Sequence, residues 1–505
     1  MNPDNTQRKQ GHLFVALLGG LILLGLALRF WRLGDWNFQA TEIFTLRDSL
    51  SPRLSNPRPL GYLLNYYLVR PFLPLDEFGL RLLPATFGLL AIPAFYLVSR
   101  RLIGMRAAFL GTLLLTVSPV LVLYSQLARY WSLVFLLSTV YPYALYLGLR
   151  ERNPRALALG LVAGVLAALA HPVAVLLVGG LGVWSVATYV RPGNLAQLWS
   201  QRGARWGTAI AVLVAALVVV RFVPVLQNWI SLHDKHPGGQ FLLRPPSKPG
   251  LKQILYVMAF VDGLTLPLAL IGVVGISLLW RERDRSLALL LTCLAGFPLL
   301  TLTLISFRAP VSTYYLLPAV PVFFIGAGVF VDRLFEVGWK AAPRWLLPAI
   351  VTILVVAPGV PTLISDYRDG RRFDFRGMAR WLEARMAPED VVFSDQPVVM
   401  AHYLPGAAVT RLRQDPLPLM EAERVLQQGG RKGTLWIVAP APSHAFRANL
   451  KSGGLISWMY DNCQLRNTMG VGRVDYRQEY LQVYRCPPGA PGSDSTRTSS
   501  SGSRR

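Results

Sequence analysis

Residues 31–84 read WRLGDWNFQATEIFTLRDSLSPRLSNPRPLGYLLNYYLVRPFLPLDEFGLRLLP and lie between two long apolar runs. The stretch is too polar and too rich in proline to cross a bilayer. It nevertheless carries many side chains of the kind that favours a membrane–water interface: Trp31, Trp36, Phe38, Phe44, Tyr62, Tyr66 and Tyr67. This pattern predicts an external loop of short helices that lies on one face of a membrane and holds an active site against it.

The composition is that of a membrane protein. The chain has 505 residues, of which 53% are hydrophobic and 15% are charged, whereas a soluble protein carries about 25% charged residues. Apolar runs recur from Leu13 to Leu363. The net charge of +24 does not indicate a nucleic-acid partner, because many of the arginines lie in short loops between these runs. The first run lacks a small-residue cleavage site and is long enough to remain as a span.

The apolar runs predict about eleven transmembrane helices, each of about 20 residues. They fall near residues 13–30, 82–99, 107–124, 132–149, 156–170, 173–190, 207–223, 254–280, 286–305, 314–331 and 345–363. A basic cluster follows every even-numbered span, such as Arg100, Arg101 and Arg106 after the second. The positive-inside rule then puts the N-terminus in the cytoplasm. The 31–84 loop and everything after the last span are expected outside.

The chain is expected to form two domains and a tail. Residues 1–363 form an all-α polytopic membrane domain, residues 364–486 an extracytoplasmic domain, and residues 487–505 a disordered tail of low complexity. Helical spacing and short buried strands alternate within 364–486, which predicts an α/β domain: 374–386, 391–393, 417–428, 435–438 and 480–484. Cys463 and Cys486 can form a disulfide outside the cytoplasm if their geometry permits it.

Polar residues at the outer span ends are candidates for binding an anion. Gln126, Arg129 and Tyr130 fall within about one helical turn at the junction of the third and fourth spans. Arginine suits phosphate because it presents a planar fork of donors. The alternative is that these residues only anchor the span ends among lipid headgroups.

Other outer residues have the same two interpretations. Arg308 and Tyr315 lie at the start of the tenth span, and His171 lies in the turn between the fifth and sixth. In the first loop, Arg58 and Tyr62 are one turn apart on a helix that Pro59 opens. We expect all of them on the outer face, either as interfacial residues or as parts of one site.

Glu42 is the candidate general base. It is the only acid between Asp35 and Asp48, and it has aromatic neighbours that favour a raised carboxyl pKa. The alternative is a carboxylate on a helix surface. Asp35 is the second candidate, whereas Asp76 and Glu77 are expected to cap the following helix.

A metal site is not predicted. His233, Asp234 and His236 have the side chains of metal ligands. The adjacent Lys235 and the irregular spacing favour a solvated loop instead.

In their order and spacing, several segments resemble one family. They are FGLRLLP (78–84), SQLARYWSL (125–133), YLLP (315–318) and DFRG (374–377), together with His171. They are similar to segments of the GT-C class of membrane glycosyltransferases, in the branch of the protein O-mannosyltransferases and the aminoarabinose transferase of lipid A. The resemblance extends from the first span to about Tyr484.

This resemblance implies a GT-C fold and a reaction at the outer face of the plasma (inner) membrane. A sugar passes with inversion from a polyprenyl-phosphate donor to a lipid, glycan or protein hydroxyl, in cell-envelope or lipopolysaccharide-type biosynthesis. An acid of the first loop acts as base or holds a divalent metal ion, the only cofactor left open. The implied catalytic residues are Glu42 and Asp35. The donor phosphate is bound by Arg58, Tyr62, Arg81, Gln126, Arg129, Tyr130, Arg308 and Tyr315, with His171 as a further site residue.

The chain departs from the family pattern at the acid. The family's Asp-Glu pair is Thr41-Glu42 here, and its HPPLYY segment is NPRPLGY (56–62) without the histidine. Leu127 stands in place of an acid and Tyr314 in place of an arginine. Two alternatives therefore stay open: a catalytically impaired relative that binds the lipid, and a lipid or glycan transporter. A transporter favours charges or helix breaks near mid-span, whereas most charges here lie at span ends.

Overall fold

The computed structural model describes residues 3–189, 264–281, 284–307, 311–337, 343–368, 373–412, 433–440, 455–470 and 480–486. The chain divides into two compact units. The membrane unit comprises Met1–Gly34 and Thr45–Val360, and the C-terminal unit comprises Asp35–Phe44 and Pro361–Arg505.

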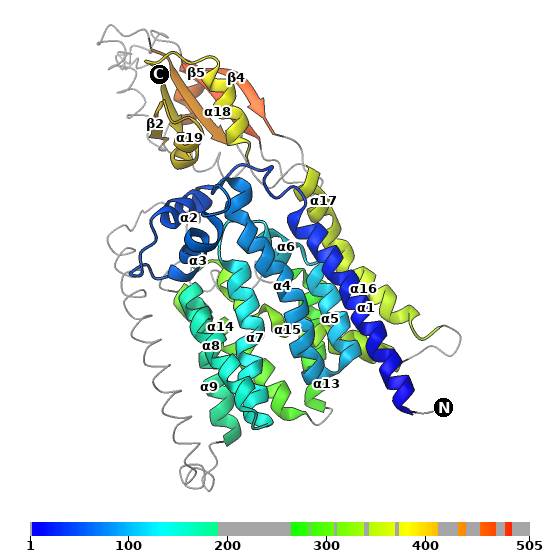
Figure 1. The fold of residues 1–505 in the computed structure, drawn as a ribbon. Helices are drawn as coiled ribbons and strands as arrows, with labels where there is room; N and C mark the ends of the chain where they lie inside the picture. The colour runs from blue at the N-terminus through cyan, green and yellow to red at the C-terminus, as the bar shows by residue number, and fades with distance from the viewer. Residues whose placement is uncertain are drawn as a thin grey trace, which may run out of the picture. The chain divides into compact units, whose positions relative to one another are not determined.

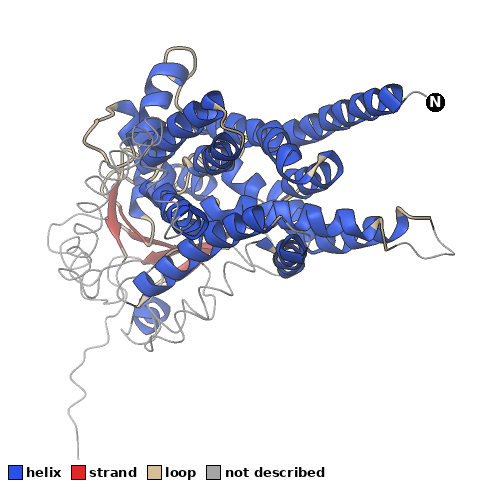
Figure 2. Ribbon diagram, turned by 90° about the horizontal axis from the view of Figure 1, so that it is seen from below, coloured by secondary structure: helices blue, strands red, loops and turns tan. Residues whose placement is uncertain are grey.

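Helices alone make up the described part of the membrane unit (Figures 1 and 2). In chain order they are α1 (Pro3–Phe30), α2 (Ala40–Leu50, shared with the C-terminal unit), α3 (Pro59–Leu64), the π-helix η1 (Asn65–Val69), α4 (Glu77–Ile103), α5 (Met105–Thr116), α6 (Pro119–Ser125), α7 (Trp131–Arg150), α8 (Pro154–Ala170), the 3₁₀ helix η2 (Pro172–Val175), α9 (Leu176–Tyr189), α13 (Leu266–Arg281), α14 (Arg285–Ser306), η3 (Thr313–Ala319), α15 (Val320–Leu334), α16 (Leu346–Val356) and η4 (Ala357–Gly359). Helix α17 (Val360–Arg368) leads into the C-terminal unit.

Six of the described helices are long and apolar enough to cross a membrane, and the bent pair α5–α6 adds a seventh. Three shorter apolar helices, Pro154–Ala170, Pro172–Thr188 and Leu266–Arg281, overlap the predicted spans 156–170, 173–190 and 254–280. The predicted span 207–223 lies outside the described residues, so the total of eleven stays a prediction. Helices α5 and α6 meet at 62° just before Pro119, because proline cannot continue the hydrogen-bond ladder of a helix.

The core of the membrane unit is a set of closely packed helices around α4, α7 and α15. Helix α7 packs on α4 and α8, and α15 packs on α5 and α13. Glycines allow the closest approach: a Cβ added at Gly275 of α13 would lie 1.8 Å from the carbonyl oxygen of Gly326 on α15. Small residues of this kind are typical of helix interfaces in membranes.

Ion pairs join the basic clusters at one end of the bundle. Arg106, in the first turn of α5, pairs with Asp332 near the end of α15. Arg150, at the end of α7, lies 3.2 Å from Asp284, which precedes α14. These two pairs join the loop regions after the second and tenth spans and after the fourth and eighth spans. The cluster after the sixth span lies outside the described residues, and the side of the membrane on which the clusters lie stays a prediction.

The described part of the C-terminal unit combines helices with a mixed five-stranded sheet, whereas the predicted bounds of the domain, 364–486, stay a prediction. Its sheet has the strand order β2-β1-β3-β5-β4. Strand β1 is parallel to β2 and β3, and β5 is antiparallel to β3 and β4. The elements are α18 (Phe375–Glu383), β1 (Val391–Ser394), α19 (Pro397–Tyr403), β2 (Ala408–Arg411), β3 (Leu435–Pro440), α22 (Leu455–Asn462), β4 (Gln464–Met469) and β5 (Leu481–Cys486). The predicted helix at 417–428 and the tail 487–505 lie outside the described residues.

Alternating side chains of the sheet bury two apolar clusters, one on each face. Helices α18 and α19 cover the face of Val392, Trp436 and Val483, whereas α22 covers the face of Phe393 and Ile437. Cys463 and Cys486 form a disulfide between the residue after α22 and the end of β5, the pairing that the sequence left open.

A short segment of the first loop belongs to the C-terminal unit. Asp35–Phe44 groups with Pro361–Arg505 and not with the helices that flank it in sequence. Its Ala40 and Ile43 pack against the apolar cluster under α18 and α19. The acid-bearing part of the first loop is therefore held by the C-terminal unit, whereas the predicted topology stays a prediction.

Candidate functional site

The connection between α6 and α7 carries the predicted SQLARY motif, and it is locked to the end of α1. The Gln126 amide donates to the carbonyl oxygens of Leu28 and Trp31, at 3.2 Å each. Arg29 of α1 also donates to the carbonyl oxygen of Thr116, the last residue of α5, at 3.2 Å. Each side chain satisfies carbonyls that a helix end leaves without an intrahelical donor. Gln126 thus fixes the connection, and its contact with a phosphate stays a prediction.

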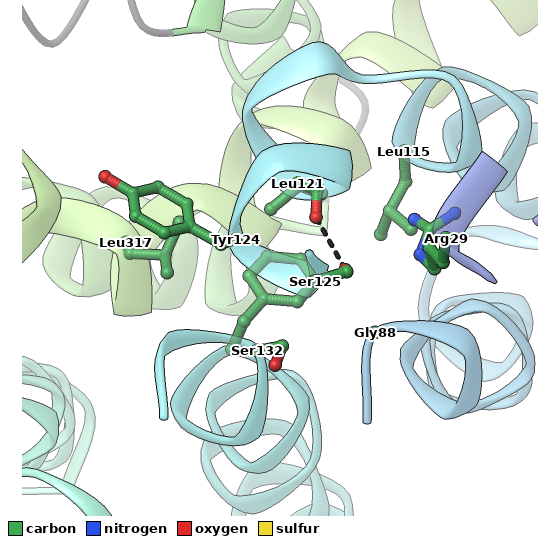
Figure 3. Close-up of a pocket in the computed structure, with 9 residues that line it drawn as sticks. Arg29, Gly88, Leu115, Leu121, Tyr124, Ser125, Ser132 and Leu317 are labelled. Atoms are coloured by element: carbon green, nitrogen blue, oxygen red, sulfur yellow. Dashed lines mark hydrogen bonds between the residues drawn. The ribbon is translucent and has the colours of Figure 1, made fainter. Parts of the chain in front are cut away.

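A small cavity lies behind this connection (Figure 3). It measures about 10 Å³, room for about one water molecule. Figure 3 shows Arg29 and Leu115 on one side, Tyr124 and Leu317 on the other, and Ser125 and Ser132 between them. The dashed line marks the hydrogen bond that the Ser125 hydroxyl donates to the Leu121 carbonyl oxygen, 2.6 Å long. The cavity is too small for a sugar.

Arg129 and Tyr130 follow at the start of α7. The Arg129 guanidinium is half-buried and donates to the Thr45 hydroxyl of α2 at 3.1 Å. Tyr130 is buried and meets the Tyr62 ring edge-on, with centroids 4.8 Å apart. Helix α3 approaches so closely that a Cβ at Gly61 would lie 1.8 Å from the Tyr130 ring. The first loop and the α6–α7 connection are thereby packed together.

His171 occupies the turn between α8 and η2. Its Nδ1 accepts the Val173 N–H at 3.1 Å, so the ring proton of the neutral form is on Nε2. The side chain is 7% exposed, and Nε2 has no hydrogen-bond partner among the described residues. Burial, followed by the nearby charges of Arg58 and Arg129, holds the pKa of His171 well below 6.5. His171 is therefore a neutral N–H donor on which the charges of two arginines act.

An aromatic cluster surrounds this histidine. The centroid of the Trp131 ring lies 4.6 Å from that of His171 and 4.8 Å from that of Tyr314. The centroid of the Tyr315 ring lies 5.9 Å from that of His171 and 4.9 Å from that of Tyr314. The charges of Arg58 and Arg129 also act on the Tyr315 side chain.

Four segments that the sequence puts outside are linked here: the charges of Arg58 in the first loop and Arg129 in the α6–α7 connection act on both His171 and Tyr315, whose rings lie 5.9 Å apart between centroids. We call Arg58, Arg129, His171 and Tyr315 the cation cluster. It holds two permanent positive charges and one buried N–H donor. Such a set can bind an anion of the size of a phosphate group.

The other predicted residues lie as follows. Arg81 is fully buried and donates to the Leu33 carbonyl oxygen at 3.0 Å. Arg308 lies outside the described residues, as do His233 and its neighbours. Asp76 caps α4 by accepting the N–H groups of Phe78 and Gly79, as predicted. Sequence reasoning missed Thr45; its position, three residues after Glu42, was the only available signal.

Glu42 is buried in the first turn of α2. Its Oε2 accepts the Gln39 N–H at 2.9 Å, the reciprocal half of a capping box. Asp35 is exposed, and its carbonyl oxygen accepts from Arg376 of α18. Both acids belong to the C-terminal unit. Within the described ranges, no three acid, histidine or cysteine side chains gather as a metal site.

A polar hollow of about 430 Å³ opens beyond the end of α2. Such a volume is within the range of ligand pockets, about 300–1,000 Å³. Its lining within the described chain is Arg47, Asp48, Ser51, Arg53, Ser55 and Asn56.

No known protein family matches this chain by sequence, and no curated protein matches it either. Its fold matches that of ArnT from Cupriavidus metallidurans in the apo state, with a TM-score of 0.55 and 17% identity over 95% of this chain and 98% of that chain. The same ArnT bound to undecaprenyl phosphate matches with a TM-score of 0.52 and 16% identity, over 94% of this chain and 98% of that chain. The Archaeoglobus fulgidus oligosaccharyltransferase in the apo form matches with a TM-score of 0.54 and 12% identity, over 90% of this chain and 73% of that chain. The chain therefore has the GT-C fold that the motifs predict.

Proposed function

We propose that this chain, which has the fold of the GT-C membrane glycosyltransferases, transfers a sugar from a polyprenyl-phosphate donor to an acceptor hydroxyl. The acceptor is a lipid, glycan or protein on the extracytoplasmic face of the inner membrane, in cell-envelope or lipopolysaccharide-type biosynthesis. The carrying observation is His171: a buried, neutral N–H donor that faces no acceptor in the described chain and that two arginines influence. An unpaired buried donor costs about 1–3 kcal/mol, and a bound phosphate would remove that cost.

The proposed reaction assigns a role to each part. Glu42, or Asp35 if Glu42 is not the base, accepts the proton of the acceptor hydroxyl. The acceptor oxygen then attacks the anomeric carbon from the face opposite the phosphate, and the bond from that carbon to the phosphate oxygen breaks. The departing polyprenyl phosphate keeps the electron pair. Arg58, Arg129 and the His171 Nε2–H stabilise its charge, which grows in the transition state.

The fold neighbours support the lipid-linked donor. One ArnT structure contains undecaprenyl phosphate, and an archaeal oligosaccharyltransferase was solved with an acceptor peptide. The aromatic cluster around His171 supports it as well, because aromatic rings suit the interface at which an isoprenoid phosphate would lie. The disulfide of the C-terminal unit supports an oxidising compartment on that side of the membrane.

For the acceptor we propose the polar hollow beyond α2, since hydroxyl and charged side chains line it. Arg53→Ala is then expected to raise the KM for the acceptor and to leave the KM for the donor unchanged. A rise in the donor KM instead would contradict this placement.

The test is sugar transfer by the purified protein from radiolabelled polyprenyl-phosphate sugars. Wild type is compared with Glu42→Gln and Arg129→Ala. Arg333→Ala is the matched control, because Arg333 lies in the last turn of α15, pairs with Glu336 at 2.8 Å and is not part of the cation cluster. Turnover that both site variants lose and the control keeps would support the proposal.

Other outcomes select the alternatives. Turnover that survives Glu42→Gln moves the base to Asp35. Saturable lipid binding that needs Arg129, without turnover, favours a catalytically impaired relative. Neither binding nor turnover with any donor would overturn the proposal and leave a transporter as the explanation.

A further inference from the structure

The C-terminal unit holds the acid-bearing segment of the first loop by specific contacts. The Tyr403 hydroxyl, at the end of α19, accepts the Phe38 N–H at 2.6 Å. Arg376 of α18 donates to the Asp35 carbonyl oxygen. The buried Phe38 ring lies against the His402 ring, with centroids 5.5 Å apart. Backbone and side chain of this segment are thus both fixed.

The next backbone N–H in the chain fixes the acid. Gln39 N–H donates to Glu42 Oε2 at 2.9 Å. Two consecutive backbone N–H groups therefore connect Tyr403 to the acid. The Phe38 N–H donates to the Tyr403 hydroxyl, and the Gln39 N–H donates to the Glu42 carboxylate. Because peptide groups are planar and the Phe38 ring is packed, few torsions remain by which the carboxylate can move relative to Tyr403.

Helix α2 needs this support. It has 11 residues, and helices shorter than about 12–15 residues are marginal in water without tertiary packing. Ala40 and Ile43, in its first turn, pack against the apolar cluster of the C-terminal unit. That cluster therefore stabilises the turn that carries Glu42.

We propose that Tyr403 is a positioning residue for Glu42, and that the C-terminal unit sets the geometry of the acid through it. This inference rests on the proposed function, in which Glu42 is the base. It also gives the DFRG motif (374–377) a task. Asp374 caps α18 by accepting the Gly377 N–H at 2.8 Å, and Arg376 reaches the acid-bearing segment from the first turn of that helix.

The test replaces single hydroxyls in the full-length protein. Tyr403→Phe removes the acceptor of the Phe38 N–H. Tyr484→Phe is the matched control, because it removes a tyrosine hydroxyl of the same unit that donates to Gln482 at 2.9 Å on the last strand. We expect Tyr403→Phe to lower kcat about ten-fold and to leave the donor KM nearly unchanged. The control should leave both unchanged.

The pH–rate profile separates positioning from general damage. A hydrogen bond to a carboxylate favours its charged form and lowers its pKa. If Tyr403→Phe weakens the hydrogen bond from the Gln39 N–H to the Glu42 carboxylate, the acid limb of the pH–rate profile should move to higher pH. An unmoved limb, or equal losses in Tyr403→Phe and Tyr484→Phe, would overturn the inference.

Hydrogen–deuterium exchange of the protein in nanodiscs tests the inference without activity. Peptides covering 36–44 should exchange faster in Tyr403→Phe than in wild type, and Tyr484→Phe should match wild type. Equal exchange in all three proteins would overturn the inference. An inactive wild type with faster exchange in Tyr403→Phe would instead refute the proposed function and keep the structural link.

Discussion

The role of His171 can be divided into two parts by substitution. Nδ1 caps η2 by accepting the Val173 N–H, whereas Nε2 carries the proton proposed for the phosphate. Asparagine places an acceptor near the position of Nδ1 but lacks the reach of Nε2. Glutamine places a donor near Nε2 but is a poor cap. His171→Asn therefore keeps the cap and loses the donor, and His171→Gln does the opposite.

The expected magnitudes follow from these contacts. A hydrogen bond to a charged group contributes about 1.5–3 kcal/mol. If it strengthens in the transition state, its loss lowers kcat about 10- to 150-fold. His171→Asn should show this loss with little change in thermal stability. His171→Gln should keep most of the activity and lose stability, since a lost cap costs about 1 kcal/mol.

The assay is sugar transfer under saturating donor, with Tm measured on the same preparations. Full activity in His171→Asn would refute the role of Nε2 as a donor. Equal loss of activity in both variants, with equal loss of stability, would mean that His171 acts only through packing.

The pH dependence of stability gives a second measurement on the same residue. The pKa of His171 in the folded protein is well below 6.5, so the unfolded chain binds more protons just below that pH. Stability contributed by the neutral ring is thus complete above about pH 6.5 and is lost as the pH falls. His171→Gln should flatten the acid side of the Tm profile, and an unchanged slope would contradict the burial of a neutral ring.

Three further predictions concern other parts of the chain. Gly61→Ala should lower activity, because the added Cβ would lie 1.8 Å from the Tyr130 ring. Gly182→Ala is the control, because a Cβ there has nothing within 4 Å, and equal activities of the two variants would contradict the close packing of α3 on Tyr130. Burial raises the pKa of Asp395 to about 7. The folded state therefore binds more protons than the unfolded one between about pH 4 and 7, and it loses stability as the pH rises through this range. Asp395→Asn should flatten the dependence of Tm on pH and raise Tm at pH 8, and an unchanged pH dependence would refute this prediction. Cys463→Ser opens the disulfide of the C-terminal unit and should lower that unit's stability by about 2–4 kcal/mol; a Tm equal to that of wild type would contradict a structural bond.

The sequence predicts the features that depend on local pattern. Apolar runs predict the helices, and the basic clusters predict which loops share an end of the bundle. The Arg150–Asp284 pair joins two of these loops. Alternating buried strands predict the α/β domain. Asp76 is predicted as a cap because a helix N-terminus needs an acceptor within its own first turn.

The partners of polar side chains could not be predicted in the same way. Gln126 and Arg81 have the chemistry of phosphate ligands, but they donate to carbonyls of residues 28, 31 and 33. A side-chain amide or guanidinium binds a carbonyl oxygen as readily as a phosphate. The packing of α1 therefore determines which acceptor these side chains bind, and the sequence does not record that packing. The membership of Asp35–Phe44 in the C-terminal unit likewise depends on contacts with residues over 300 positions away, which no local pattern records.

Binding of undecaprenyl phosphate to the purified protein tests the central claim most directly, because it does not depend on knowing the sugar or the acceptor. The account predicts saturable binding by wild type and by Arg333→Ala, weakened at least about ten-fold by Arg129→Ala, as expected for the loss of a charge-assisted contact to phosphate. Equal affinity in wild type and Arg129→Ala would contradict the assignment of the cation cluster to the donor phosphate.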